Sequence, residues 1–126
     1  MEIIKGKNIK LNYLINLLKK GMVLVVPTDT VYGIICDSTN QKAINSLFKI
    51  KERPKNKPLP IFVKDIKMAK RIAFIDREQE KYLKSVWPGK VTVILKPRKK
   101  LPFGIGKRGR EVGLRVPKNK LINNLL

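Results

Sequence analysis

The chain has 126 residues and 29 lysines and arginines against 9 aspartates and glutamates, a formal net charge of +20 that indicates an anionic partner unless the lysines only fill solvated faces. One cysteine and no histidine exclude an internal disulfide and an imidazole base, and no apolar run reaches the roughly 20 residues of a membrane span. The length fits one domain, residues 1–126, with a core of its own, and the lack of a signal-like leader favours the cytoplasm.

Apolar periodicity in the first half of the chain predicts two helices separated by two strands. A surface helix is expected within residues 8–20, where leucine and isoleucine recur at helical spacing and lysines occupy the last turn. Met22–Val26 and Tyr32–Cys36 are apolar on both faces, so each is predicted to be a fully buried strand. A second helix is expected to end at Glu52 or Arg53, because a proline follows. Its buried face is predicted to hold Ala43, Ile44, Leu47, Phe48 and Ile50.

The second half of the chain predicts further strands and helices. The expected strands are Leu59–Val63, Val91–Leu95 and Val112–Val116, and the expected helices are Asp65–Ile72, Asp76–Ser85 and the beginning of one in Lys118–Leu126. Pro60 interrupts the first of these strands, which therefore belongs at a sheet edge or a bulge. Lys96–Arg110 combines prolines, glycines and cations and is expected to form a long exposed basic loop or hairpin. The whole pattern predicts an α/β fold, a twisted mixed open sheet with helices packed against it.

Small polar side chains follow the first predicted strand directly, in the run Pro27-Thr28-Asp29-Thr30-Val31-Tyr32-Gly33. Ligands of open α/β sheets bind where buried strands end, and this run offers two threonine hydroxyls and a carboxylate there. Gly33 allows the backbone to turn or to approach a ligand closely. A binding loop is therefore indicated, although an Asp29 that caps a turn would explain part of the pattern.

Cations surround the predicted end of the second helix and the loop that leads into the next strand. Lys51, Arg53 and Lys57 lie there, and prolines at 54 and 58 stiffen the segment between them. Arginine offers a planar fork suited to phosphate or carboxylate, and lysine offers a point charge. The pattern indicates an anion site, while a basic helix end that complements its own dipole is the simpler alternative.

Two further motifs have an order that periodicity does not require, Trp87-Pro88-Gly89-Lys90-Val91-Thr92 and Val112-Gly113-Leu114-Arg115-Val116-Pro117. Together with the run Pro27–Gly33, Lys51-x-Arg53-Pro54 and Pro58-Leu59, they make five elements in a fixed order. In these elements the chain resembles the L-threonylcarbamoyladenylate synthase family, the YrdC-type domain. The resemblance implies a twisted mixed sheet around a large, basic, concave cavity.

The resemblance also implies an activity, the joining of L-threonine, bicarbonate and ATP into threonylcarbamoyl-adenylate with release of pyrophosphate. A transferase complex would then pass the threonylcarbamoyl group to adenosine 37 of tRNA, and Mg²⁺ would accompany the ATP. The implied threonine ligands are Thr30 and Arg115, the implied nucleotide ligands are Lys51, Arg53 and Lys57, and Thr28, Tyr32 and Thr92 are expected to line the pocket. No catalytic side chain and no protein metal ligand is implied, so positioning and electrostatics would carry the reaction.

Several of these residues have alternative explanations. Arg115 lies in an apolar strand, where an unpaired cation is costly, so we expect either a bound anion or a carboxylate partner. Trp87 is expected to anchor the core rather than to stack on a base, and Thr92 could be an ordinary strand residue. Cys36 is expected to be a packing residue, because no histidine is present to activate it.

Two other functions fit the same residues. A basic module that binds double-stranded RNA or tRNA without catalysis would use the net charge and the segment Lys96–Arg110, where Phe103 lies among cations. A YrdC-type domain detached from a larger carbamoyl-transfer enzyme would share the five motifs. A dependence of nucleotide turnover on threonine would separate the synthase from this last alternative.

The family pattern continues after the Arg-x-Pro strand with a helix and a Ser-x-x-Ser-Ala-Asn motif, which has no counterpart in these 126 residues. We therefore expect a YrdC-type fold that lacks its last third. A gene fragment, one half of a two-chain enzyme and a relative that only binds would all fit this pattern. In each case the chain alone is predicted to make threonylcarbamoyl-adenylate poorly or not at all.

Overall fold

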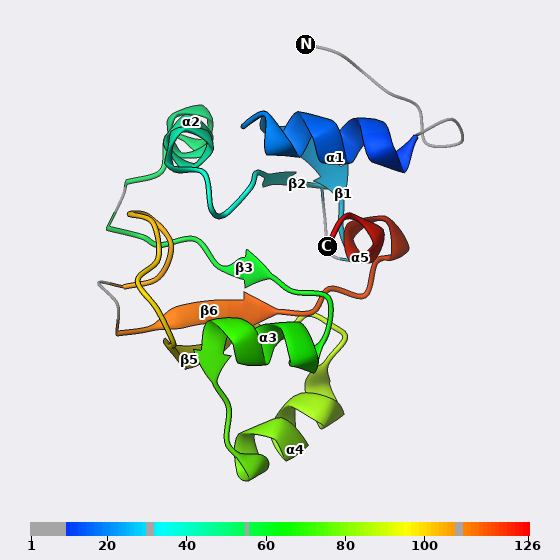
Figure 1. Cartoon of the computed structure of the whole chain (residues 1–126), viewed down its shortest axis with the longest axis vertical. Coiled ribbons are helices and arrows are strands. Elements are labelled where there is room, and N and C mark those ends of the chain that lie inside the picture. Colours follow the sequence, from blue (N-terminus) through cyan, green and yellow to red (C-terminus); the bar gives the residue numbers. More distant parts are fainter. Residues whose placement is uncertain (1–9, 30–31, 55, 108–109) are drawn as a thin grey trace.

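The computed structural model describes residues 10–29, 32–54, 56–107 and 110–126 (Figure 1). Its helices are α1 (Leu11–Lys19), α2 (Gln41–Lys51), α3 (Ile66–Ile72), α4 (Arg77–Val86) and α5 (Lys120–Leu125). Its strands are β1 (Leu24–Pro27), β2 (Tyr32–Ile35), β3 (Ile61–Phe62), β4 (Ala73–Phe74), β5 (Val93–Pro97) and β6 (Val112–Arg115). Within these described ranges, no helix is both long and apolar enough to cross a membrane.

The strands form two separate sheets. A four-stranded sheet has the order β3-β6-β5-β4, in which β3 and β6 run parallel and the other neighbours run antiparallel. The second sheet is the antiparallel pair β1–β2. Figure 1 shows this pair next to α1 in the upper half, and the larger sheet below it with α3 and α4. The predicted mixed α/β architecture is confirmed. Strand β3 begins just after Pro60 and lies at a sheet edge, as expected for the strand that this proline interrupts.

The core is formed between the larger sheet and the helices. Its fully buried side chains come from the helices, the strands and the residues just after β3 and β6. The largest are Ile44, Leu83, Leu114, Ile122, Val63, Val112 and Pro117. Trp87 is 7% exposed and donates its indole N–H to the carbonyl of Val91 at 2.8 Å. The expectation that Trp87 anchors the core is therefore confirmed.

Helix ends follow the predicted capping residues. Asp65 accepts a hydrogen bond from the backbone N–H of Met68 and begins α3, and Asp76 forms a reciprocal capping box with Gln79 at the start of α4. Helix α2 ends at Lys51, and Glu52 follows it in the left-handed region with φ 51°. The helix therefore ends before Pro54, one residue earlier than the predicted Glu52 or Arg53, because Glu52 leaves the helical conformation and forms its C-cap.

The prediction of two fully buried strands at the start of the chain is wrong. Val25 of β1 is 62% exposed and Tyr32 of β2 is 74% exposed, and Met22, predicted to be part of the first strand, is 51% exposed. Only Val26 of β1 is buried. A two-stranded pair has one face that no other layer needs to cover, so an apolar run on both faces did not require burial of both. Similarly, Ile50 lies on the outward side of α2 and is 58% exposed.

The segment Lys96–Arg110, of which residues 108–109 lie outside the described part, is not simply the expected exposed loop or hairpin, although Lys107 does pair antiparallel with Glu111. Strand β5 extends to Pro97, Gly104 is buried against Phe48 and Ile44 of α2, and Ile105 is buried in the core. The N–H of Leu59 donates to the carbonyl of Gly104 at 2.9 Å, which ties the segment to the entry of β3. The prolines and glycines therefore shape a packed turn whose lysines face solvent, which local composition alone does not distinguish from a free loop.

Candidate functional site

A buried ion pair joins the loop after β1 to the end of β6. Arg115 donates from Nη2 to Oδ1 of Asp29, and the two side chains are only 11% and 9% exposed. The expectation that Arg115 needs a partner is confirmed in one of its two forms, a carboxylate of the same chain. Asp29 therefore has a role beyond capping a turn.

Further hydrogen bonds fix both members of this pair. Arg115 donates from Nε to the carbonyl of Gly89 at 2.8 Å, and Oδ2 of Asp29 accepts from the N–H of Lys118 at 2.9 Å. The guanidinium also lies 5.4 Å from the centre of the Phe62 ring. Burial lowers the pKa of Arg115, and the ionised Asp29 beside it compensates the charge. Three of the five sequence motifs thus meet at one point.

The basic loop after α2 is built around Arg53. Its Nε donates to the carbonyl of Lys57 at 2.8 Å and its Nη2 to the carbonyl of Pro58 at 3.2 Å. The N–H of Lys57 donates to the carbonyl of Pro54 at 3.0 Å, which closes the turn. Lys51 and Lys57 are exposed. Arg53 therefore shapes the loop, and the two lysines present its charge to solvent.

The two cationic centres belong to neighbouring parallel strands. Phe62 of β3 is paired in register with Arg115 of β6, and the loop that contains Lys57 leads into β3. Lys57 therefore precedes the N-terminal end of β3, whereas Arg115 lies at the C-terminal end of β6. A common hollow for the two centres stays a prediction.

A cavity of about 480 Å³ lies elsewhere, between α4 and β5. Its lining includes Glu78, Tyr82, Leu83, Thr92, Val93 and Ile94. This cavity is mainly apolar and contains no lysine or arginine in its lining. It is therefore not the basic cavity that the resemblance implies.

The residues expected to line the threonine pocket have different positions. Thr30 lies outside the described residues. Thr28 is half-buried and packs close to Gly33, where an added Cβ would lie 3.2 Å from its methyl carbon. Tyr32 is 74% exposed, and Thr92 belongs to the apolar cavity.

Cys36 behaves as a packing residue. Its side chain contacts the hydrophobic core and is partly buried. Burial raises the pKa of the Cys36 thiol to about 11, with a smaller contribution from Asp37. The thiol is therefore protonated at neutral pH, which agrees with its predicted role.

Two site features were not predicted from the sequence. One is Asp29 as the partner of Arg115, which the opposite charges within two motifs could have indicated. The other is Gln41, whose side-chain amide donates to the carbonyl of Phe103 at 2.9 Å and accepts from its N–H at 2.8 Å. This pairing across 62 residues has no local signal.

The fold and these contacts define a mixed α/β domain in which a buried arginine–aspartate pair and a basic loop flank adjacent parallel strands. The chain belongs to the Sua5/YciO/YrdC family, because the family model described as "Telomere recombination" matches residues 16–126.

Curated relatives carry the name of an enzyme. Threonylcarbamoyl-AMP synthase of Methylobacillus flagellatus is 32% identical to 86% of this chain, and the Bos taurus protein of the same name is 30% identical to 86% of it. The matched part is 61% of the first protein and 39% of the second. The chain therefore spans less than two thirds of the length of these relatives.

Solved structures of the family superpose closely. Sua5 of P. abyssi in complex with L-threonine has a TM-score of 0.84 and 28% identity, covering 98% of this chain and 36% of that one. YciO of E. coli has a TM-score of 0.82 and 29% identity, covering 92% of this chain and 57% of its own. The predicted family and fold are confirmed.

Proposed function

We propose that this chain forms the L-threonine-binding and ATP-binding part of a threonylcarbamoyl-AMP synthase. The observation that carries the proposal is the buried Asp29–Arg115 pair at the meeting point of three family motifs. Relatives named threonylcarbamoyl-AMP synthase and a relative complexed with L-threonine support it. The product would serve the modification of tRNA adenosine 37 through a separate transferase complex.

In the proposed reaction the amine of threonine attacks the carbon of bicarbonate, and water leaves as the carbamate forms. A carbamate oxygen then attacks the α-phosphorus of ATP, and pyrophosphate leaves. Arg115 would hold the threonine carboxylate through its fork, and Lys51 and Lys57 would stabilise charge on the phosphates. Since the chain has no histidine, the amine proton would pass to solvent or to another substrate.

Magnesium is proposed only as the companion of ATP. The part of the chain that the structure describes contains no group of three or more histidine, cysteine, aspartate or glutamate side chains that could hold a metal ion. The ion would therefore be bound mainly by the phosphates themselves. No step of the reaction is assigned to a protein-bound metal.

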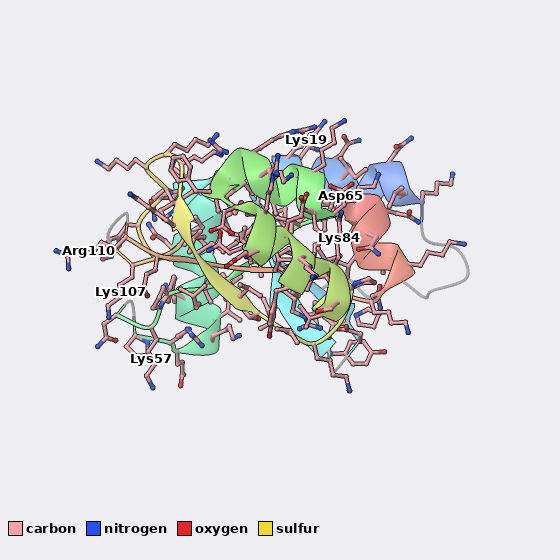
Figure 2. The ribbon with its side chains drawn as sticks, turned by 90° about the horizontal axis from the view of Figure 1, so that it is seen from below. Lys19, Lys57, Asp65, Lys84, Lys107 and Arg110 are labelled. Atoms are coloured by element: carbon pink, nitrogen blue, oxygen red, sulfur yellow. The ribbon has the colours of Figure 1, made fainter. Side chains whose placement is uncertain are left out.

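A pair of lysine variants tests the nucleotide part of the proposal. Lys57→Ala should weaken ATP binding at least fivefold in isothermal titration, because it removes a point charge from the basic loop. Lys84 is also exposed but lies on α4, away from Lys57 in Figure 2, so Lys84→Ala serves as the matched control. Equal effects of the two substitutions would mean that the affinity for ATP depends only on the net charge of the chain.

Product formation tests the reaction itself. The chain is incubated with ATP, L-threonine, bicarbonate and Mg²⁺, and threonylcarbamoyl-adenylate is measured by mass spectrometry together with pyrophosphate. Release of pyrophosphate should require threonine if the chain acts as a synthase. Pyrophosphate release that ignores threonine would contradict the proposal and favour a carbamoyl-transfer enzyme.

One observation favours RNA binding as a second candidate function. Lys57, Lys107 and Arg110 project outward at the same end of the molecule in Figure 2, and Phe103, 66% exposed, belongs to the same packed segment as Lys107. Exposed cations and an exposed aromatic ring on one segment are suited to contact a nucleic-acid backbone and base. Tight RNA binding at moderate salt, with no thermal shift from ATP or threonine, would favour this function over the synthase.

A further inference from the structure

We propose that Asp29 makes the Arg115 site selective for a zwitterionic amino acid and against phosphate. The role of Asp29 rests on the proposed function, in which Arg115 holds the carboxylate of threonine. It adds a specificity-determining residue to that site.

Selectivity is a physical problem for this chain because its two proposed substrates differ in charge. The net charge of +20 attracts every phosphate in solution, and ATP and pyrophosphate both carry several negative charges. An arginine without a counter-ion is among the best phosphate ligands that proteins offer. A threonine site built on an unpaired arginine would therefore be occupied by phosphate.

Within the described part of the chain, the hydrogen bonds of Arg115 engage one edge of its guanidinium. Nε and Nη2 lie on the same edge, and they donate to Gly89 and Asp29 respectively. Nη1 and the second hydrogen of Nη2 form the other edge, which has the spacing of a carboxylate. The internal contacts thus orient Arg115 toward a planar anion.

Asp29 cannot turn away easily from this arrangement. Its Oδ1 accepts from Arg115 and its Oδ2 from the N–H of Lys118, so both oxygens are held by different segments. Each carboxylate oxygen can still accept a second hydrogen bond. A ligand ammonium group beside Arg115 would find this acceptor capacity.

Burial allows the Asp29–Arg115 ion pair, which has no net charge, to discriminate between ligands. Because both side chains are about nine-tenths buried, their charges act with little screening by water. A phosphate dianion at Arg115 would be repelled by Asp29, whereas threonine would place its carboxylate near Arg115 and its ammonium near Asp29. Neither of the two ion pairs in the described part of the chain involves Lys51 or Lys57, so these lysines keep their attraction for phosphate.

The experiment compares ligands at Arg115 itself. The side-chain N–H signal of Arg115 is followed by nuclear magnetic resonance in the full chain, and it is assigned by its loss in Arg115→Lys. The chain is titrated separately with L-threonine, with 3-hydroxybutanoate, which lacks the amine, and with inorganic phosphate. We expect L-threonine to bind at least tenfold more tightly than either anion.

Asp29→Asn should reduce the preference for threonine over phosphate at least tenfold, because it removes the charge and keeps the size of the side chain. Asp65→Asn is the control. It changes the net charge equally, and the carboxylate of Asp65 caps α3 by accepting from the N–H of Met68. The control should change the preference less than twofold. If Asp29→Asn does not fold, the comparison of threonine with 3-hydroxybutanoate in the unsubstituted chain still decides the proposal.

Three results would overturn the role of Asp29 and leave the proposed function standing. These are an unchanged preference in Asp29→Asn, an equal change in Asp65→Asn, and equal affinities for threonine and 3-hydroxybutanoate. If the unsubstituted chain binds no threonine at Arg115, the proposed function and the role of Asp29 both fail.

Discussion

At the scale of single residues, the side chains that looked like ligands also hold the structure. Arg53 closes the loop between α2 and β3 through two backbone carbonyls, and Arg115 connects both sheets through Asp29. A substitution at either arginine therefore affects the shape of the site as well as its charge. Tests of function need matched controls for this reason.

Replacing Arg53 should separate these two effects. Arg53→Ala removes the hydrogen bonds to the carbonyls of Lys57 and Pro58 and should lower the free energy of unfolding by about 1–2 kcal/mol. Arg53→Lys keeps the charge but not the fork, so it should be nearly as destabilising. Urea unfolding measures both, with the exposed Arg71→Ala as control. Full stability in Arg53→Lys would show that only the charge matters.

The cysteine gives a prediction about reactivity. Burial raises the pKa of the Cys36 thiol from its ordinary range to about 11, so the thiolate fraction at pH 8 should be about a hundredfold lower than for an exposed thiol. Labelling with a chromogenic disulfide at pH 8 should therefore be slow in the native chain and fast in urea. Since Cys36 is the single cysteine, the signal is unambiguous. Equal rates would contradict the burial.

At the scale of elements, the sequence predicted those features that depend on neighbouring residues, such as the starts of helices. Asp65 and Asp76 marked the starts of α3 and α4, because an aspartate caps a helix through its own neighbours. Strand β4 has only two residues and exists through its pairing with β5, so no local pattern predicts it. The burial of Gly104 likewise depends on a distant helix, α2.

Gly104 tests the packing of this segment directly. It has φ +101°, and an added Cβ would lie 2.5 Å from Cε2 of Phe48 and 3.1 Å from Cγ2 of Ile44. Gly104→Ala should cost about 2–4 kcal/mol of stability, from backbone strain and overpacking together. Lys100→Ala, at an exposed position of the same segment, should change stability by less than about 0.5 kcal/mol. A harmless Gly104→Ala would restore the expectation of a free loop.

At the scale of the whole molecule, the motifs indicated the family, and the structure added how they meet. The run Pro27–Gly33 and the strand with Arg115 are separated by about 80 residues, and an ion pair brings them together. Because Arg115 lies in an apolar strand, the sequence predicted that its guanidinium needs an anionic partner. It did not identify Asp29, because the choice between a bound anion and a carboxylate depends on tertiary contacts.

The net charge gives a prediction for the molecule as a whole. Repulsion among the charges that make up +20 opposes the compact state, and salt screens it. The thermal unfolding midpoint should therefore rise by about 3–5 °C between low and physiological ionic strength, equivalent to about 1 kcal/mol. Differential scanning calorimetry in sodium chloride checks this. A midpoint that falls with salt would mean that attractive ion pairs dominate.

The most direct test of the account is where L-threonine binds. Backbone amide signals of the isotope-labelled chain are followed during a titration with L-threonine in the presence of ATP. We predict that the largest shifts fall on residues 28–33 and 113–118, the two segments that Asp29 and Arg115 join. No shifts, or shifts confined to the apolar cavity between α4 and β5, would contradict it.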